Sequence, residues 1–594
     1  MKPYLKLISL MLISIMLLSA LASCSPSFNL IEDNENNDGE NKDGEQQEGN
    51  QDGNAEQTAN APENPDVLTI FKNSAYTVKV VIPENATTAE SSVYANLRSE
   101  LEDKISVAAP YITDRLNEGE TRDPNEYAIL VGNTNYEESK QAYEGLTYGN
   151  SSLQVINNKI VLAFTTRDEG MTLIHRLARA IETDSNKSFW IARSLSFTNK
   201  SVTLPSDMPE YPSSQLSLVD CDDDTTMIVA GRTTLDEFNL YCNALVEQSG
   251  YTSYSSHDNV NGNYFRTYTK DSTAVTAYFM AYSKTARIIS GPISHIPTKD
   301  ADTTPERYEP ELTIVSQSEW MNNGLGMIYL LPNGKFLIID GGYDRRDNFY
   351  KLLKNLAPDE DEIVIAAWYI SHPHGDHHQA LMNLLKNHSK DVKIESVLFN
   401  FTLPERYDAI TTGSDGSGAS KNFRNTLARY LGKDTKIIKP HTGQIYEYGS
   451  AQVEVLFTVE DVLPGELDYL NTTSLVTRIK IGEHSMMALA DTTHVTSKAL
   501  ENNFGSYLQS EMVQLAHHGT YPGYASLYTK INAKVLIWPS NYSNAESQIT
   551  NGAVAAAVKY ATDVYVANKT NITLKIPYTC VNNKQDFLAD INQS

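Results

Sequence analysis

The segment 371–378 constrains this 594-residue chain most, because it places four imidazoles and a carboxylate within eight residues. It follows the continuous apolar run 363–370, which is typical of a buried strand, and it precedes leucines at helical spacing. A loop between a strand and a helix lets side chains converge while the scaffold stays rigid. Neutral imidazole is the commonest metal ligand, and a carboxylate suits a dication. The segment therefore predicts a metal-binding loop, with a His-rich loop that binds no metal as the alternative.

The spacing within this loop, His-x-His-x-Asp-His after a strand, resembles the signature of the metallo-β-lactamase superfamily. Other segments follow in the order expected of that superfamily. Two strands joined by an Asn-Gly turn end at Asp340, a second hairpin ends at Asp491, and the strand 511–516 precedes a pair of histidines. The resemblance covers residues 310–580 and implies an αββα sandwich as the C-terminal, catalytic domain.

The resemblance also implies a role for each polar residue. His372 and His374 would hold one metal, with His441 left open as a further ligand or a loop histidine. The other metal would be held by Asp376, His377 and one of the pair His517 and His518, with Asp491 shared and Asp340 orienting a ligand from behind. The expected metal ligands are therefore His372, His374, Asp376, His377, His441, Asp491 and His518, and the expected catalytic residues are Asp376, His377, Asp491 and His517.

The adjacent pair His517 and His518 cannot be assigned from sequence alone. Neighbouring residues on an extended chain point to opposite sides, so we expect one to ligate and the other to contact substrate, and we favour His518 as the ligand. Ligands without cysteine suit two zinc ions, although manganese or iron also fits. His484 is expected to be a solvated turn residue. His494 is expected to lie near the metals, or else to start a helix.

Three short motifs narrow the resemblance to one branch of the superfamily, namely 471–476, 488–491 and 516–520. They resemble the extracytoplasmic domain of DNA-uptake competence channels and the phosphorylcholine esterases, which implies phosphodiester hydrolysis. Two alternatives stay open. One is a lactonase or other metallo-hydrolase on the same fold, because the fold does not set the substrate. The other is a non-enzymatic envelope-binding lipoprotein. Gln379 and Ala380 stand where the superfamily usually has glycines, so the turn into the helix is expected to differ.

The N-terminus predicts where the protein works. Two lysines and the apolar run 7–21 are typical of a secretory signal peptide over residues 1–23. The residues before Cys24 resemble a bacterial lipobox, which implies a lipid on Cys24 and a location on the outer face of the cell membrane; an uncleaved anchor is the alternative. Residues 24–66 are acidic and almost free of apolar side chains, which predicts a disordered linker.

Charge bears on the partners. The formal net charge is −26, and no basic footprint for duplex nucleic acid is evident. We therefore expect a cell-envelope polymer or a small phosphodiester as the substrate, with nucleic acid as an alternative that the charge disfavours. Cys221 and Cys242 are expected either to form a disulfide or to be free buried thiols.

The rest of the chain predicts a multidomain protein of mixed α/β and α+β class. Alternating strands and helices over 67–205 predict an α/β domain, which resembles the non-catalytic domain that precedes the barrel in β-hexosaminidase-type glycoside hydrolases. A helix near 233–250 and strands near 263–268 and 274–282 predict a small α+β domain over 206–300. Its tyrosine-rich stretch is expected to be β-structure rather than a sugar-binding surface, because tyrosine favours strands.

Overall fold

The structure is a computed structural model that describes residues 66–591 apart from short gaps. The gaps are 117–121, 145, 147–149, 166, 199–203, 205–206, 214, 297–301, 317–323, 345–346, 359–361, 409–415, 466, 468 and 569. The predicted signal peptide, Cys24 and all of the linker before Asp66 lie outside the described residues. Within the described part of the chain, no helix combines the length and the hydropathy needed to cross a membrane.

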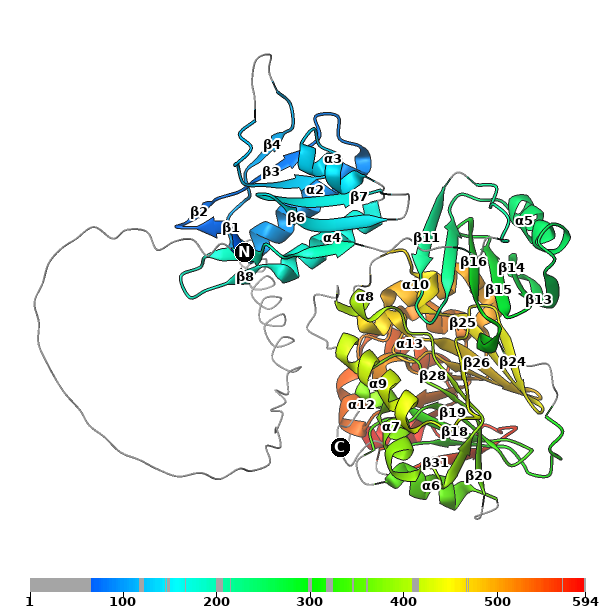
Figure 1. The fold of residues 1–594 in the computed structure, drawn as a ribbon. Coiled ribbons are helices and arrows are strands. Elements are labelled where there is room, and N and C mark those ends of the chain that lie inside the picture. Colours follow the sequence, from blue (N-terminus) through cyan, green and yellow to red (C-terminus); the bar gives the residue numbers. More distant parts are fainter. Residues whose placement is uncertain are drawn as a thin grey trace, which may run out of the picture. The chain divides into compact units, whose positions relative to one another are not determined.

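The described chain contains several sheets and many helices, which confirms the mixed α/β character (Figure 1). The domain boundaries at 67–205, 206–300 and 310–580 stay predictions. Cys221 and Cys242 are both buried and both free, so the disulfide alternative is wrong and the thiol alternative holds.

Two sheets form residues 67–198. A four-stranded sheet has the order β2-β1-β9-β8, and a six-stranded sheet has the order β10-β6-β7-β5-β3-β4. The strands are β1 (Val67–Lys72), β2 (Ala75–Tyr76), β3 (Lys79–Ile82), β4 (Tyr111–Thr113), β5 (Ala128–Val131), β6 (Ser151–Ile156), β7 (Lys159–Phe164), β8 (Glu182–Thr183), β9 (Phe189–Ala192) and β10 (Ser196–Thr198). The helices are α2 (Thr88–Ile105), α3 (Glu137–Tyr143) and α4 (Arg167–Ala180). A capping box at Thr87 and Glu90 starts α2.

Residues 216–292 form a six-stranded antiparallel sheet with the order β11-β12-β16-β15-β14-β13. The tyrosine-rich stretch lies in β13, β14 and β15, so it is β-structure as expected. The elements are β11 (Leu216–Asp220), β12 (Thr226–Ala230), α5 (Leu235–Glu247), β13 (Thr252–Val260), β14 (Asn263–Lys270), β15 (Thr273–Met280), β16 (Thr285–Pro292) and the 3-10 helix η1 (Ile293–His295).

Two further sheets form the larger C-terminal part. The first has the order β23-β22-β20-β19-β18-β17-β31, with β21 beside β20. Its strands are β17 (Glu311–Ile314), β18 (Gly326–Leu330), β19 (Phe336–Asp340), β20 (Ile363–Tyr369), β21 (Val392–Ile394), β22 (Ser396–Leu398), β23 (Lys436–Ile438) and β31 (Ile572–Lys575). The second has the order β24-β25-β26-β27-β28-β29-β30. Its strands are β24 (Ile445–Tyr448), β25 (Ala451–Phe457), β26 (Val476–Ile481), β27 (His484–Ala488), β28 (Met512–Gln514), β29 (Val535–Trp538) and β30 (Asp563–Val566).

These two sheets share a buried apolar layer, to which Leu337 and Ala367 contribute from the first sheet and Val453 and Ile479 from the second. Because side chains alternate along a strand, the opposite faces are free to pack against helices. The helices are α6 (Asn348–Leu356), α7 (Gly375–His388), α8 (Pro404–Asp408), α9 (Gly416–Tyr430), α10 (His494–Phe504), α11 (Ala525–Ile531), α12 (Tyr542–Gln548), α13 (Gly552–Tyr560) and α14 (Lys584–Ile591). Short 3-10 helices are η2 (Val459–Asp461), η3 (Leu470–Thr473), η4 (Gly505–Leu508) and η5 (Ala516–Gly519).

The strand directions explain where polar loops collect. β20 runs parallel to β19 and β22, and β27 runs parallel to β28. Asp340 ends β19, and the loop with His372 follows β20. In the other sheet, Asp491 follows β27, and His518 follows β28. All four segments therefore lie at carboxyl ends of parallel strands, where open α/β sheets commonly bind their ligands.

Candidate metal centre

Two groups of metal-ligand side chains meet where these loops converge. One group contains Asp376, His377, Asp491 and His518, and the other contains His372, His374 and Asp491. Within each group the ligand atoms lie within 4.8 Å of one another. We call these the four-residue group and the three-residue group. Asp491 belongs to both.

Asp491 faces the two groups with different oxygens. Its Oδ1 lies 3.3 Å from His377 Nε2 and 3.5 Å from His518 Nε2. Its Oδ2 lies 3.7 Å from His372 Nε2, on the side of the three-residue group. The carboxylate is buried, and its backbone N–H donates to Ser474 Oγ at 3.3 Å. The two oxygens of one carboxylate thus face different groups of imidazole nitrogens.

The hydrogen bonds behind the four-residue group fix which imidazole nitrogen faces inward. His377 Nδ1 lies 2.8 Å from Asp340 Oδ2, and His518 Nδ1 lies 3.0 Å from the carbonyl oxygen of Pro539. A carboxylate and a carbonyl oxygen accept only, so both Nδ1 atoms carry a proton, and in the neutral ring that binds a metal each Nε2 atom presents a lone pair. Asp340 thus lies behind the His377 ring, and its role in orienting a ligand stays a prediction.

The same argument applies to His372. The Ser371 hydroxyl donates its hydrogen to Asp340 Oδ2 at 2.7 Å, so toward His372 Nδ1, 3.0 Å away, it can only accept. His372 therefore carries its proton on Nδ1 and turns the lone pair of Nε2 toward His374 Nδ1, which lies at 2.8 Å. At this distance the two ring nitrogens share a hydrogen bond, which His374 Nδ1–H donates, and a cation bound by both rings would replace it.

Buried atoms without partners test whether a metal fits. His377 Nε2, His518 Nε2 and Asp491 Oδ1 are buried and have no hydrogen-bond partner among the described residues. A buried polar atom left unpaired usually costs about 1–3 kcal/mol, so three such atoms facing one point need an explanation. Imidazole lone pairs and a carboxylate oxygen are the donor set that zinc, manganese or iron accepts. The residues fit the cation.

Electrostatics in the metal-free site follow from the crowding of charges. Burial lowers the pKa of His377, but the carboxylates of Asp491, Asp376 and Asp340 outweigh it and raise that pKa well above its usual value. The pKa of Asp491 is lowered well below the usual range, because neighbouring imidazoles outweigh burial. Burial lowers the pKa of His372 well below its usual value. The site is thus built to keep its carboxylates charged.

The turn that holds His517 and His518 differs from expectation. Both residues have left-handed backbones, with φ of 49° and 55°, so the extended chain assumed from the sequence is wrong. Gly519 continues the turn, and a Cβ there would come within 2.6 Å of the Trp538 ring. Trp538 Nε1 in turn donates to the His518 carbonyl oxygen at 2.8 Å. This packing directs His518 into the four-residue group.

His517 lies at the edge of the centre. Its side chain is 31% exposed, and its Nε2 lies 3.8 Å from Asp491 Oδ2. Asn471 lies between the His517 ring and the Asp491 carboxylate, with its Nδ2 3.2 Å from Asp491 Oδ2 and 3.1 Å from His517 Nε2. Sequence reasoning assigned no role to Asn471, although the motif 471–476 was the signal that contained it.

The three remaining histidines that the sequence analysis considered lie outside both groups. His441 is buried and its Nδ1 lies 2.8 Å from Glu460 Oε2, so the structure places it in a separate polar contact rather than with His372. His494 starts α10, and its ring packs against that of Tyr524 at a tilt of 39°, with ring centroids 4.6 Å apart. His484 is buried rather than solvated, because its ring lies between Glu511 and the Tyr329 hydroxyl.

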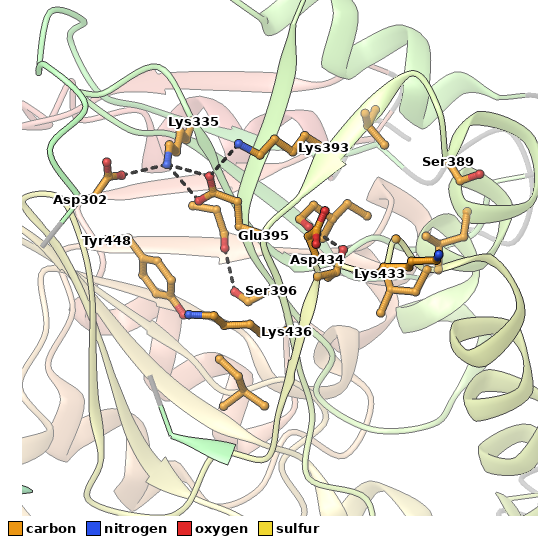
Figure 2. A pocket seen from close by; sticks show the side chains of 18 of the residues that line it. Asp302, Lys335, Ser389, Lys393, Glu395, Ser396, Lys433, Asp434, Lys436 and Tyr448 are labelled. Carbon is orange, nitrogen blue, oxygen red and sulfur yellow. Dashed lines mark hydrogen bonds and ion pairs between the residues drawn. The ribbon is translucent and has the colours of Figure 1, made fainter. Parts of the chain in front are cut away.

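A pocket of about 620 Å³ lies elsewhere on the first sheet (Figure 2). Ser396 and Lys436, which line it, are the first residues of β22 and β23, so it opens at the amino ends of strands whose neighbours carry the metal ligands at their carboxyl ends. Lys335 on its wall pairs with Glu395 at 2.9 Å and with Asp302 at 3.1 Å. None of its lining residues belongs to either metal-ligand group.

No family model matches the sequence, and no curated protein matches it. Solved structures to which the chain is similar include the metallo-beta-lactamase fold protein YhfI from Bacillus subtilis, at 14% identity over 45% of this chain and 100% of that chain, with a TM-score of 0.29. CmlA, a diiron beta-hydroxylase from Streptomyces venezuelae, is 13% identical over 58% of this chain and 79% of that chain, with a TM-score of 0.27. Unliganded yeast PDE1 is 11% identical over 45% of this chain and 99% of that chain, with a TM-score of 0.29.

Proposed function

We propose that this chain is a metal-dependent hydrolase of the metallo-β-lactamase type that uses two divalent cations. The observation that carries the proposal is the position of Asp491, whose two oxygens face two separate groups of imidazole nitrogens. A carboxylate that served only the fold would have its oxygens paired with donors. Here Oδ1 has no hydrogen-bond partner among the described residues.

The two groups suit different tasks. Asp376, His377, Asp491 and His518 offer four protein ligands, enough to complete a tetrahedral site. His372, His374 and Asp491 offer three, which leaves a position for water or substrate. When bound, a pair of dications lowers the pKa of water and neutralises charge that develops on a phosphoryl group. Zinc suits this ligand set best, and manganese or iron also fits.

The residues beside the three-residue group support a phosphodiester as the substrate. The Asn471 amide and the His517 ring both lie next to Asp491 Oδ2, on the side with the free position. The amide nitrogen already contacts Asp491 Oδ2 and His517 Nε2, so it would donate to a phosphoryl oxygen in exchange for one of these contacts, and there it would stabilise the charge that develops. The proposed reaction needs no nucleophilic side chain, because water can attack phosphorus directly.

We also propose that the enzyme works outside the cytoplasmic membrane, tethered by a lipid on Cys24. The residues before Cys24 and the apolar run 7–21 support this proposal. More than one acyl chain anchors a protein stably, since each buried methylene group contributes about 0.8 kcal/mol to membrane binding. Labelling cells with a fatty-acid analogue should mark the wild type but not Cys24→Ala, which should appear in the medium with unchanged specific activity. Labelling of both proteins would refute the anchor.

Metal content and turnover together test the main proposal. The purified protein should contain about two metal ions per chain and should hydrolyse bis-p-nitrophenyl phosphate. Asp491→Asn should lose both, whereas Asp563→Asn, a buried carboxylate in the same sheet but outside both groups, should keep both. A wild type that holds no metal after incubation with zinc or manganese would overturn the proposal. Full metal loading with turnover of a lactone but of no phosphodiester would retain the hydrolase and refute the phosphodiesterase.

A further inference from the structure

Exposed tyrosines concentrate on the loops that build the metal centre. Tyr469 is 52% exposed, Tyr521 is 64% exposed and Tyr524 is 45% exposed. Tyr469 lies two residues before Asn471, and Tyr521 lies three residues after His518. Only three other tyrosines, at positions 111, 282 and 308, are among the exposed large side chains of the described chain. We call the three tyrosines of the site loops the tyrosine rim.

Contacts between the loops hold the rim beside the centre. The Thr472 hydroxyl lies 3.1 Å from the Thr493 hydroxyl, which joins the Tyr469 loop to the segment after Asp491. The Tyr524 ring packs at a tilt against His494, three residues after Asp491, at 4.6 Å between centroids. The Tyr524 backbone N–H donates to Ser497 Oγ at 3.1 Å. The three loops therefore form one packed surface around the carboxylate that the two groups share.

The loop that carries Tyr521 is held firmly in an unusual conformation. Tyr521 has a φ of 53°, a region that bulky residues rarely adopt and that costs of order 1–3 kcal/mol. Gly523 also has a positive φ of 77°, and a Cβ there would come within 3.0 Å of Ser497. The Tyr528 hydroxyl donates to the Pro522 carbonyl oxygen at 3.0 Å and accepts from the Ala516 N–H at 3.1 Å. A fold that fixes a large ring in solvent at such a cost is expected to use it for binding.

We propose that the tyrosine rim binds a sugar ring carried by the phosphodiester, and so makes the enzyme selective for phosphodiesters of sugars. Phenol rings offer a rigid apolar face for the C–H face of a sugar, and a hydroxyl for its polar edge. The net charge of −26 disfavours a polynucleotide, whose many phosphates would be repelled. The inference rests on the proposed function, since the rim gains this role only from its position beside the hydrolytic centre.

Two phosphodiesters that share the same leaving group separate binding of the sugar from the chemical step. The probes are the p-nitrophenyl phosphodiester of glucose at its 6-position and ethyl p-nitrophenyl phosphate. Wild type should prefer the sugar ester by about tenfold or more in kcat/KM, which corresponds to the 1–2 kcal/mol expected of one good stacking contact. Tyr521→Ala and Tyr524→Ala should remove most of this preference through KM, whereas Tyr521→Phe should keep it. Tyr282→Ala is the matched control and should change nothing, because Tyr282 is equally exposed but lies in the turn between β15 and β16.

The outcomes distinguish this inference from the proposed function. Hydrolysis of both esters with no preference, or equal losses on both in the alanine variants, would refute the rim and leave the hydrolase intact. Hydrolysis of neither ester would refute the proposed function. In that case calorimetry with glucose 6-phosphate against inorganic phosphate still tests the rim, which should favour the sugar phosphate in wild type and not in Tyr521→Ala. A stronger dependence on Tyr521 for the matching uridine ester than for the glucose ester would overturn the assignment to sugars.

Discussion

Replacing Asp340 with asparagine should empty one metal position without disturbing the fold around it. The Asp340 side chain is completely buried and accepts three hydrogen bonds. They come from the Ser371 N–H at 2.8 Å, the Ser371 hydroxyl at 2.7 Å and His377 Nδ1 at 2.8 Å. An amide has the same shape but only one accepting oxygen, so at least one of these donors would meet an N–H instead.

The consequence for His377 is a change of tautomer. If the asparagine amide nitrogen faces His377 Nδ1, its N–H can form a hydrogen bond only when Nδ1 is the acceptor. The ring proton then moves to Nε2, which removes the lone pair that faces Asp491. Loss of an outer partner of this kind weakens metal binding about 10–100-fold. That range corresponds to about 1.4–2.7 kcal/mol. The affinity of the four-residue group should fall by this factor, with a matching loss of turnover.

Asp563→Asn provides the matched control. Asp563 is also fully buried and also accepts three hydrogen bonds, from the Tyr578 hydroxyl and two backbone N–H groups, each at 2.8 Å. Both variants should lose similar unfolding free energy, about 1–3 kcal/mol, as measured by urea denaturation of the metal-free proteins. Only Asp340→Asn should weaken zinc binding in competition with a chelating dye. Unchanged zinc affinity and turnover in Asp340→Asn would refute the argument from tautomers.

Four further results are expected. His484→Ala should lower the unfolding free energy by about 1–3 kcal/mol while leaving metal content unchanged, because its ring bonds inside the core. Zinc binding should release protons, seen as a buffer-dependent heat in calorimetry, and should strengthen with rising pH. Burial lowers the pKa values of His377 and His518, but their carboxylate neighbours outweigh burial and raise both pKa values. These rings therefore hold protons to higher pH than a free imidazole, and zinc must displace those protons. Asn471→Ala should keep its metals and lose about tenfold or more in kcat. The Cys221 thiol should stay unreactive toward a thiol reagent until the protein unfolds, because burial raises its pKa.

The strand–loop–helix unit around His372 could be predicted from sequence because its signals are local. An apolar run, a cluster of ligands and leucines at helical spacing all lie within one short stretch. The structure has β20 and α7 at those places, and it brings Asp376, His377 and His518 together with Asp491. That these loops would meet was implied only by the resemblance, and the parallel strands that bring them to one edge are known from the structure.

The features that could not be predicted from the sequence depend on contacts with residues far away in the chain. His484 follows a glycine in a turn and looked solvated, yet Glu511 and Tyr329 bury its ring from other strands. Two successive left-handed histidines contradict local preference, since φ near 50° is uncommon outside glycine. The turn is imposed by Trp538, whose ring packs against Gly519. Asn471 acquires a role only because the fold brings it to Asp491.

The two metal-ligand groups differ in how firmly the fold fixes them, and this difference assigns their tasks. His377 and His518 each have the outer ring nitrogen tied to a buried acceptor, so their lone pairs are aimed before any cation arrives. The His374 ring, by contrast, makes its one side-chain hydrogen bond within the described residues to its fellow ligand His372. A preorganised group binds tightly because little order remains to be imposed. The four-residue group should therefore retain its cation while the three-residue group, beside the exposed ring of His517, exchanges water and substrate.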